Sequence, residues 1–184
     1  MQFTVLQENF QRGLAVVSRA VNSRSPLPVL SNLLIKTDKG RIKVTASDLQ
    51  ITISSWIGAK VDAPGEITVP AKILIDFVNQ LSDEKIEITL DGANLKVTTE
   101  KAKANLMTIP ATEFPNLELP EDGNKLSIKS SEILKAIQQV QFASATDESR
   151  PVLTGIYLKA EKDILVIACT DGYRMAEYKL KLSK

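Results

Sequence analysis

The sequence predicts an α+β fold that repeats one unit, which consists of a strand, a helix and three further strands. Three observations support this. Apolar residues recur at helical spacing in the segments 10–22 and 70–81 and again over 133–143. Between these segments, apolar and polar residues alternate as they do in half-buried strands. Residues 10–48 also align with residues 133–171 without a gap, at an offset of 123 residues.

The first unit begins with a short apolar strand at residues 3–5 and continues into a helix over residues 10–22. Residues 33–35 and 42–46 then alternate as strands, and Asp38-Lys39-Gly40 between them is a hairpin signal. The second unit repeats this order. It has a strand at 67–69, a helix at 70–81 that Pro70 is suited to open, and a hairpin at Asp91-Gly92.

The third unit begins near residue 125, after a connector with three prolines at residues 110–123. Its helix repeats the apolar face of the first helix, because Ile133, Ile137, Val140 and Ala143 align with Phe10, Leu14, Val17 and Ala20. Its strands repeat the first unit as far as Asp171, which aligns with Asp48. We therefore expect one complete domain over residues 1–122 and the first half of a second domain over residues 123–184.

Composition excludes several classes of protein. The chain has 184 residues, of which 43% are hydrophobic and 24% charged, as is usual for a globular protein with a buried core. No apolar run approaches the roughly 18 residues of a membrane span, and the N-terminus lacks the pattern of a signal peptide. With a single cysteine, the chain has no internal disulfide, and we expect a cytoplasmic location without membrane contact.

The chain also lacks the residues that the usual catalytic and metal sites require. It has no histidine, which is the commonest general base and metal ligand, so we expect no metal site and no cofactor. The net charge of +1 gives no overall attraction to nucleic acid. A nucleic-acid role would need a local basic surface or a way of holding on that does not depend on charge.

Several short segments of the sequence, in this repeat order, resemble those of the sliding-clamp family, the β subunit of bacterial DNA polymerase III. They are "FTV" at 3–5, "RSPLPVLSNLLI" at 24–35, "TVPAKILIDFV" at 68–78, "IPATEFPNL" at 109–117 and "ACTDGYRM" at 168–175. The resemblance covers essentially the whole chain. It implies a DNA-clamp (processivity) fold, in which helices face a central hole for DNA and sheets form the outside.

The resemblance also implies a function and partners. Family members carry three similar domains, and two subunits close head to tail into a ring on duplex DNA. The implied role is a non-enzymatic processivity factor that binds double-stranded DNA regardless of sequence. The implied partners are DNA polymerase III, other proteins with a clamp-binding motif, the clamp loader and a second subunit. Because this chain ends midway through the second domain, we expect a fragment that cannot close the ring alone.

Basic residues near the predicted helices are candidates for DNA binding. Arg12 and Arg19 lie two turns apart on the first helix, away from its apolar face, and Arg24 follows in a loop. The residues alone favour a solvated helix surface. The resemblance places Arg24 in a loop that meets duplex DNA. Arg150 is the basic residue of the corresponding second loop, where Asp147 stands in the place of Arg24.

The stretch "ACTDGYRM" allows two interpretations. A catalytic one would use Cys169 as a nucleophile, but its alignment with Ala46 and the lack of a histidine favour a buried structural thiol. Asp171-Gly172 is a favoured turn sequence. The resemblance instead implies a hydrophobic groove for short peptides, part of which comes from residues beyond 184. Its matching residues are Leu153, Thr170, Gly172, Tyr173, Arg174 and Met175.

Two further hypotheses concern other residues. The resemblance places Lys72 and Leu106 where the first domain meets a partner subunit, although either is also consistent with an ordinary surface or sheet position. The alternative function is a small hydrolase that uses Asp48, Asp171 or Glu113 as acid and base. We expect no catalytic residues, because Asp48 and Asp171 occupy equivalent places in two domains, as repeated structural residues would.

Overall fold

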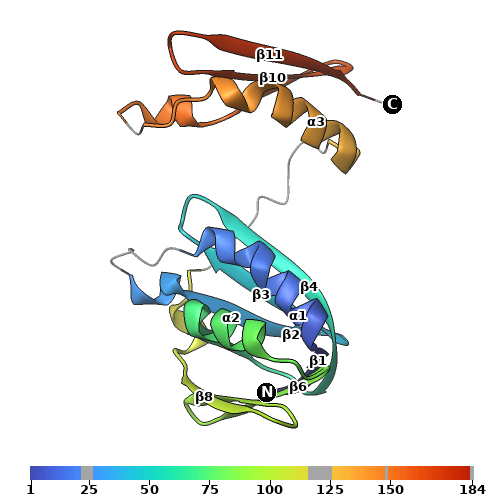
Figure 1. Cartoon of the computed structure of the whole chain (residues 1–184), viewed down its shortest axis with the longest axis vertical. Coiled ribbons are helices and arrows are strands. Elements are labelled where there is room, and N and C mark those ends of the chain that lie inside the picture. The colour runs from blue at the N-terminus through green and yellow to red at the C-terminus, as the bar shows by residue number, and fades with distance from the viewer. Residues whose placement is uncertain (22–26, 116–125, 148, 183–184) are drawn as a thin grey trace. The chain divides into compact units, whose positions relative to one another are not determined.

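The structure is a computed structural model that describes residues 1–21, 27–115, 126–147 and 149–182. The chain divides into two compact units, Met1–Leu119 and Pro120–Lys184 (Figure 1). We call them unit 1, which contains the first two sequence repeats, and unit 2, which contains the third, and we describe each by itself. Among the helices of the described residues, none is long and apolar enough to span a membrane.

Unit 1 contains two helices and one eight-stranded antiparallel sheet, as far as the structure describes it. The order of the strands in the sheet is β5-β2-β3-β4-β1-β6-β7-β8. The elements along the chain are β1 Gln2–Leu6, α1 Gln7–Val17, β2 Asn32–Asp38, β3 Arg41–Ser47, β4 Thr52–Ala63, β5 Glu66–Pro70, α2 Ala71–Gln80, β6 Lys85–Asp91, β7 Asn94–Thr98 and β8 Lys103–Met107, with short 3-10 turns η1 Ser18–Ala20, η2 Pro28–Ser31 and η3 Ala111–Glu113.

The predicted repeat within unit 1 is visible in the pairing of the strands. Strand β1 of the first half of unit 1 pairs antiparallel with β6, the second strand of the second half. Strand β5 of the second half pairs in the same way with β2, the second strand of the first half. Val5 lies opposite Ile86, and Val69 lies opposite Leu33 in the matching pair. A bridge between Thr68 and Ile109 then joins β5 to the segment that follows β8. The two halves of unit 1 are therefore related by an approximate twofold symmetry.

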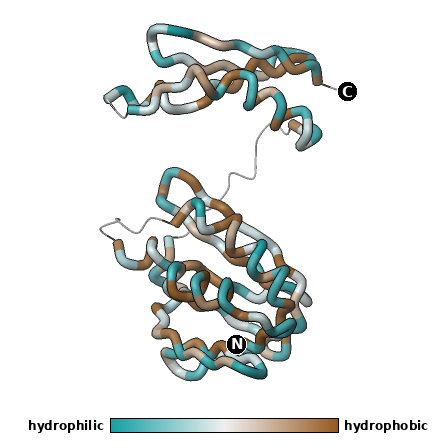
Figure 2. The backbone as a smooth tube through the Cα atoms, viewed as in Figure 1, coloured by the Kyte–Doolittle hydropathy of each residue, from teal (hydrophilic) through white to brown (hydrophobic). Residues whose placement is uncertain are grey.

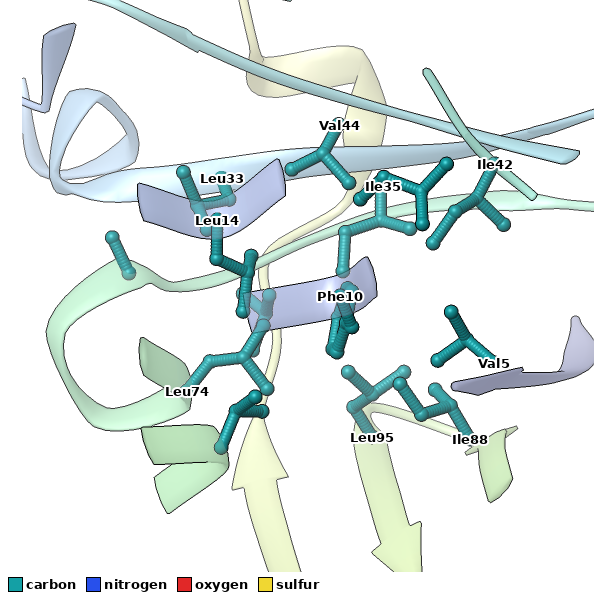
Figure 3. Close-up of a cluster of buried hydrophobic side chains, with 14 of the residues drawn as sticks. Val5, Phe10, Leu14, Leu33, Ile35, Ile42, Val44, Leu74, Ile88 and Leu95 are labelled. Carbon is teal, nitrogen blue, oxygen red and sulfur yellow. The ribbon is translucent and has the colours of Figure 1, made fainter. Parts of the chain in front are cut away.

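The core of unit 1 lies between the sheet and its two helices, which pack side by side (Figure 1). Phe10 and Leu14 from α1 and Leu74 from α2 point into it and are fully buried (Figure 3). Helix α1 approaches the sheet closely at Gly13, where an added Cβ would stand 2.2 Å from Cδ1 of Ile57. The hydrophobic segments of the chain therefore gather where sheet and helices meet (Figure 2).

Unit 2 contains one helix and a three-stranded sheet, in the part that the structure describes. The strand order is β11-β10-β9. The elements are α3 Ser130–Val140, η4 Gln141–Ala143, η5 Pro151–Thr154, β9 Tyr157–Glu161, β10 Ile164–Thr170 and β11 Met175–Lys181. Helix α3 and strand β10 begin and end 123 residues after α1 and β3, so the structure confirms the offset that the sequence predicts.

Three predicted elements differ from the structure. The first helix ends at Val17 and continues as the 3-10 turn η1, whereas the sequence pattern predicts a helix over 10–22. Pro70 ends β5 and precedes α2 instead of opening the helix. Residues 126–129, where the repeat predicts a strand, lie outside any strand. Their counterpart β1 is held between β4 and β6, and the described part of unit 2 contains no equivalent of β6.

Candidate peptide-binding pocket and nucleic-acid interface

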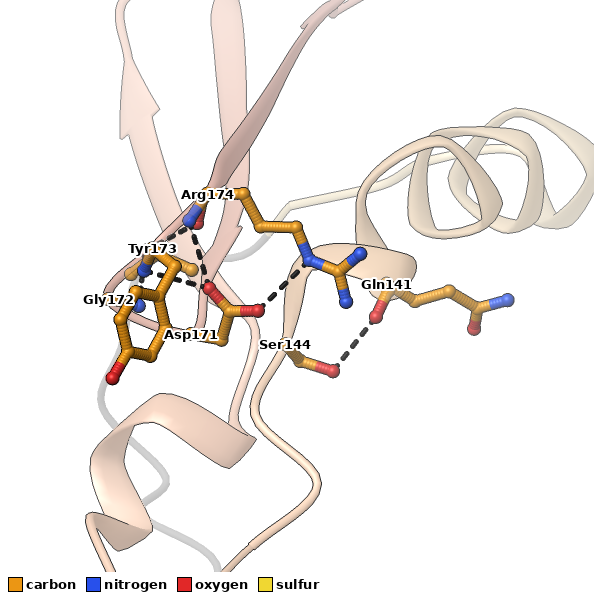
Figure 4. Close-up of polar contacts among 7 residues, drawn as sticks. Gln141, Ser144, Asp171, Gly172, Tyr173 and Arg174 are labelled. Atoms are coloured by element: carbon orange, nitrogen blue, oxygen red, sulfur yellow. Dashed lines mark hydrogen bonds and ion pairs between the residues drawn. The ribbon is translucent and has the colours of Figure 1, made fainter.

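The turn between β10 and β11 is stabilised by the side chain of Asp171. Its Oδ1 accepts hydrogen bonds from the backbone N–H groups of Tyr173 and Arg174, both at 2.9 Å (Figure 4). Gly172 adopts a left-handed conformation with φ of 91°, which a glycine accepts without strain. The backbone N–H groups that hydrogen-bond to the Asp171 carboxylate lower its pKa, and the Arg174 side chain adds to this effect.

Asp48 occupies the same turn in unit 1. Its Oδ1 accepts hydrogen bonds from the N–H groups of Gln50 and Ile51, at 2.9 and 2.7 Å. These bonds lower the pKa of Asp48 in the same way. A general acid works best when its pKa is raised toward neutrality. The lowered pKa of both carboxylates therefore favours a role in forming the turns. Among the described residues, no group of three or more His, Cys, Asp or Glu side chains could hold a metal ion.

The side chain of Arg174 is held close to its own turn. Its Nε donates to Oδ2 of Asp171 at 2.9 Å (Figure 4). Its guanidinium carbon also lies 5.8 Å from the ring centroid of Phe142, within the range of a cation–π contact. Tyr173 beside it is 99% exposed. The tip of the turn thus presents the exposed ring of Tyr173 next to the guanidinium of Arg174, which Asp171 holds in place.

A mostly apolar pocket of about 410 Å³ lies beside this turn in unit 2. It is formed by the η5 turn, the start of β9, the end of β10 and the start of β11. Its lining residues are Val152, Leu153, Gly155, Ile156, Tyr157, Ala168, Cys169, Thr170 and Met175. Of the six residues that the resemblance implies for a groove, Leu153, Thr170 and Met175 line this pocket, whereas Gly172, Tyr173 and Arg174 form the adjacent turn.

Sequence reasoning missed the wall of the pocket that η5 and β9 provide. Val152, Ile156 and Tyr157 are apolar or aromatic and are substantially exposed, and they lie in the pocket lining. The apolar residues of the run "PVLTGIY" are the signal in the sequence, although Val29, Leu30 and Leu33 at the corresponding positions of unit 1 are buried. Cys169 is buried, as predicted, and this burial raises the pKa of its thiol. It also contributes to the pocket lining, which its alignment with Ala46 did not indicate.

The equivalent surface of unit 1 is closed by the chain itself. Val29 and Leu30 stand 123 residues before Val152 and Leu153 and are buried. They form a small hydrophobic cluster with Phe114, against which Leu34 and Ile109 pack. Phe114 follows η3 and leaves only 7% of its surface exposed. An aromatic side chain from the "IPATEF" segment therefore fills in unit 1 the place that is open in unit 2.

The basic residues predicted to bind DNA lie in different settings. Arg12 is exposed on α1 and forms an ion pair with Glu8, one turn earlier. Arg19 is exposed in η1, just after α1. Arg150 is exposed directly before η5 and accepts a backbone hydrogen bond from Leu153. Arg24 lies outside the described residues.

The two residues implied at a subunit interface also differ in exposure. Lys72 is exposed on the first turn of α2. Leu106 belongs to β8, the last strand of the sheet, but its side chain is buried in the core of unit 1. Met107 beside it is 78% exposed and is the apolar side chain that this edge presents to solvent. Leu106 can therefore contribute to an interface through its backbone but not through its side chain.

Comparison with known proteins gives consistent matches along the whole chain. The family described as "DNA polymerase III beta subunit, N-terminal domain" matches residues 1–118, and the "central domain" of the same subunit matches residues 127–184. A "Beta sliding clamp" from Synechococcus elongatus is 36% identical over 183 residues, which cover 97% of this chain and 48% of the relative. One from Vibrio cholerae is 32% identical, covering 96% of this chain and 49% of the relative.

Solved structures agree with these matches. A DNA polymerase sliding clamp from Bacillus subtilis aligns with a TM-score of 0.93 at 30% identity, covering 100% of this chain and 51% of that one. The DNA polymerase III subunit beta from Pseudomonas aeruginosa aligns with a TM-score of 0.91 at 32% identity, covering 98% and 50%. The chain thus spans about half the length of these relatives. On these matches, the chain belongs to the family of the DNA polymerase III beta subunit.

Proposed function

We propose that the chain serves as part of a DNA polymerase processivity factor, a ring that encircles duplex DNA and docks replication proteins through the pocket of unit 2. The observation that carries the docking proposal is the mostly apolar pocket of about 410 Å³ beside the Asp171 turn of unit 2. A short peptide with a bulky apolar side chain is the ligand that such a pocket fits.

The chemistry of the pocket favours protein docking over catalysis. Its lining is mostly aliphatic and aromatic, and Met175 supplies a flexible side chain that adapts to different partners. The exposed Tyr173 and the positioned Arg174 at its border belong to residue types that dominate binding energy at protein interfaces. We propose that Leu153, Thr170, Gly172, Tyr173, Arg174 and Met175 form one wall of a groove for polymerase and for other proteins with a clamp-binding motif.

A titration with a peptide from the polymerase tail tests this proposal. We expect measurable binding, with a Kd below about 1 mM, or at least roughly 4 kcal/mol of binding free energy. Met175→Glu should abolish it, because the substitution places an unpaired charge in an apolar pocket. The control Ile51→Glu changes an exposed apolar residue of unit 1 and should leave peptide binding unchanged. The absence of binding at millimolar peptide, or equal loss in both variants, contradicts the proposal.

For DNA, the proposed mode is weak and independent of sequence. A ring holds DNA by enclosing it, so a chain of net charge +1 needs few phosphate contacts. We propose that Arg12, Arg19, Arg24 and Arg150 supply such contacts. Arg12 and Arg19 are exposed, so both can reach phosphates in solution. Contacts to phosphate rather than to base edges leave the protein able to slide.

The salt dependence of duplex binding tests the DNA proposal. In a double variant with Arg12→Gln and Arg19→Gln, the slope of log K against log salt should fall by about 1.8, from two lost phosphate contacts. Lys60→Gln is a matched control, since Lys60 lies on β4 and pairs with Asp62. An unchanged slope in the double variant, or an equal fall in the control, argues against these contacts.

The remaining proposals concern assembly and setting. We propose a clamp N-terminal domain over residues 1–122 and the first half of a middle domain over 123–184. The β8 edge and Lys72 are proposed to meet a second subunit in a homodimeric ring that the clamp loader places on DNA. The protein is proposed to act in the cytoplasm without enzymatic activity. Substituting both Asp48 and Asp171 by Asn should lower stability without removing any hydrolytic activity, whereas loss of such an activity would favour the hydrolase.

A further inference from the structure

The sheet of unit 1 carries an exposed tryptophan among cations on its outer face, the face that points away from α1 and α2. Trp56 on β4 is 51% exposed. Ile57 beside it is buried in the core, so Trp56 points the other way. The Nζ atom of Lys43 lies 5.1 Å from the centroid of the Trp56 ring, and the guanidinium carbon of Arg41 lies 5.9 Å from it. Both distances are within the range of a cation–π contact, so two side chains of β3 hold the ring in place.

A hollow of about 510 Å³ adjoins Trp56 on the outer face. Gly58 lines the hollow and stands two residues after Trp56 on β4, a spacing that places both on one face of the strand. A Cβ added to Gly58 would have no described atom within 4 Å. Leu6 and Lys85 also line the hollow, and they lie opposite each other on the paired strands β1 and β6. The hollow therefore exists because Gly58 leaves a gap in the sheet surface that β1, β4 and β6 form.

The cations around the ring and the hollow differ in their partners. Arg41 and Lys60 are each paired with a neighbouring aspartate, at 2.8 and 3.1 Å. Lys43 and Lys85 form no ion pair with another residue that the structure describes. The charged residues in the described lining of the hollow are Lys60 and Lys85, both of them basic. An anionic ligand on this face therefore meets two uncompensated positive charges, one beside the ring and one beside the hollow.

We propose that the outer face of the unit 1 sheet binds single-stranded nucleic acid. One base stacks on Trp56, the next nucleotide lies over the hollow at Gly58, and Lys43 and Lys85 bind phosphates. An aromatic ring with cations beside it is the arrangement by which proteins hold single strands without reading their sequence, because every base has a flat π face. Trp56 supplies the ring, and the two lysines without ion-pair partners supply the charge.

Two other anionic ligands fit this face less well. In a duplex the bases are paired and stacked on one another, so none is available to the Trp56 ring. An acidic peptide could pair with the lysines, but its carboxylates are repelled by the negative face of an aromatic ring. The proposed site is also separate from the proposed duplex contacts, because Arg12 and Arg19 belong to α1 and the turn after it, on the opposite face of the sheet.

The fluorescence of Trp56 tests the proposal directly, because it is the only tryptophan of the chain. The 184-residue chain is titrated with a thymidine oligonucleotide of about 12 nucleotides, a length within the usual range of single-strand sites. We expect quenching that saturates with a Kd of about 1–100 µM, as for binding that is independent of sequence. The same oligonucleotide annealed to its complement, or polyglutamate of equal charge, should quench far less. Absence of quenching at millimolar oligonucleotide, or equal quenching by either competitor ligand, would overturn the proposal.

The anisotropy of a labelled oligonucleotide compares variants of the site. Trp56→Leu should weaken binding about tenfold from the lost stack, and Trp56→Phe, which keeps a smaller ring, should weaken it less. In a double variant with Lys43→Gln and Lys85→Gln, the slope of log K against log salt should fall by about 1.4, from two lost phosphate contacts. Lys101→Gln with Lys103→Gln removes the same charge at the β8 end of the sheet and should leave the slope unchanged. Unchanged affinity in Trp56→Leu, or an equal fall in the control, would overturn the proposal.

Discussion

The same turn is built in both units from different residues. Leu49 has a φ of 75° and Gly172 has a φ of 91°, and the two stand 123 residues apart. The N–H of each donates to the hydroxyl group that ends the preceding strand, Ser47 or Thr170, at 3.1 Å. A leucine in this left-handed conformation is strained, whereas a glycine is not. The hydroxyl and the Asp that follows it therefore define the turn more strongly than the glycine does.

The carboxylates of this turn predict how stability depends on pH. Hydrogen bonds from backbone N–H groups lower the pKa of both Asp48 and Asp171 below the value of an unfolded chain. Their contribution is therefore fully present above about pH 4 and is lost as pH falls through the lower folded pKa values. Replacing both by Asn should flatten the loss of stability below pH 4, measured by urea unfolding at pH 7, 4 and 2.5.

A matched substitution separates this effect from general acid unfolding. Asp76 is exposed on α2, away from the two turns, so Asp76→Asn should leave the acid dependence as it is in the parent chain. An acid dependence that survives in the double Asn variant, or that disappears equally in the Asp76 control, would contradict the role assigned to the two turns.

At the scale of elements, the close approach of α1 to the sheet depends on Gly13. An added Cβ there would overlap Cδ1 and Cγ1 of the buried Ile57, at 2.2 and 2.6 Å. Gly13→Ala should therefore destabilise unit 1 by about 1–3 kcal/mol, despite the better helix propensity of alanine. Gly58→Ala is the control, because no atom lies within 4 Å of its added Cβ. Urea unfolding of both variants checks this, and equal effects would count against the packing argument.

The segment after β8 closes a pocket, and its removal has a predictable cost. Phe114 packs on Val29 and Leu30 and is almost fully buried. Phe114→Ala should destabilise unit 1 by about 3–5 kcal/mol, because it leaves a cavity between η2 and η3. Chemical denaturation followed by the fluorescence of Trp56, which lies in unit 1, would measure it. A loss below about 1 kcal/mol would mean that the site collapses or that Phe114 contributes little packing.

Much of this architecture could be predicted from the sequence, because apolar periodicity reports burial directly. The offset of 123 residues placed α3, β10 and the Asp171 turn where the structure has them. The same offset wrongly predicted a strand at residues 126–129. A strand needs a neighbouring strand to pair with, and periodicity carries no information about whether one is present. The filling of one pocket by Phe114 was likewise hidden, since it depends on a contact between segments far apart in sequence.

At the scale of the whole molecule, two units with the same local sequence pattern differ in how much of their surface is covered. Unit 1 buries the counterparts of residues that unit 2 exposes on β9 and around its pocket. Unit 2 therefore presents apolar side chains to solvent around its pocket, where we propose that a peptide docks.

We propose that the pocket of unit 2 receives a peptide. An NMR titration of the 184-residue chain with a polymerase-tail peptide checks this proposal. We expect amide shifts at Leu153, Thr170 and Met175, which line the pocket, and none at their unit 1 counterparts Leu30, Ser47 and Thr52. No shifts at millimolar peptide, or shifts confined to residues outside the pocket, would contradict it.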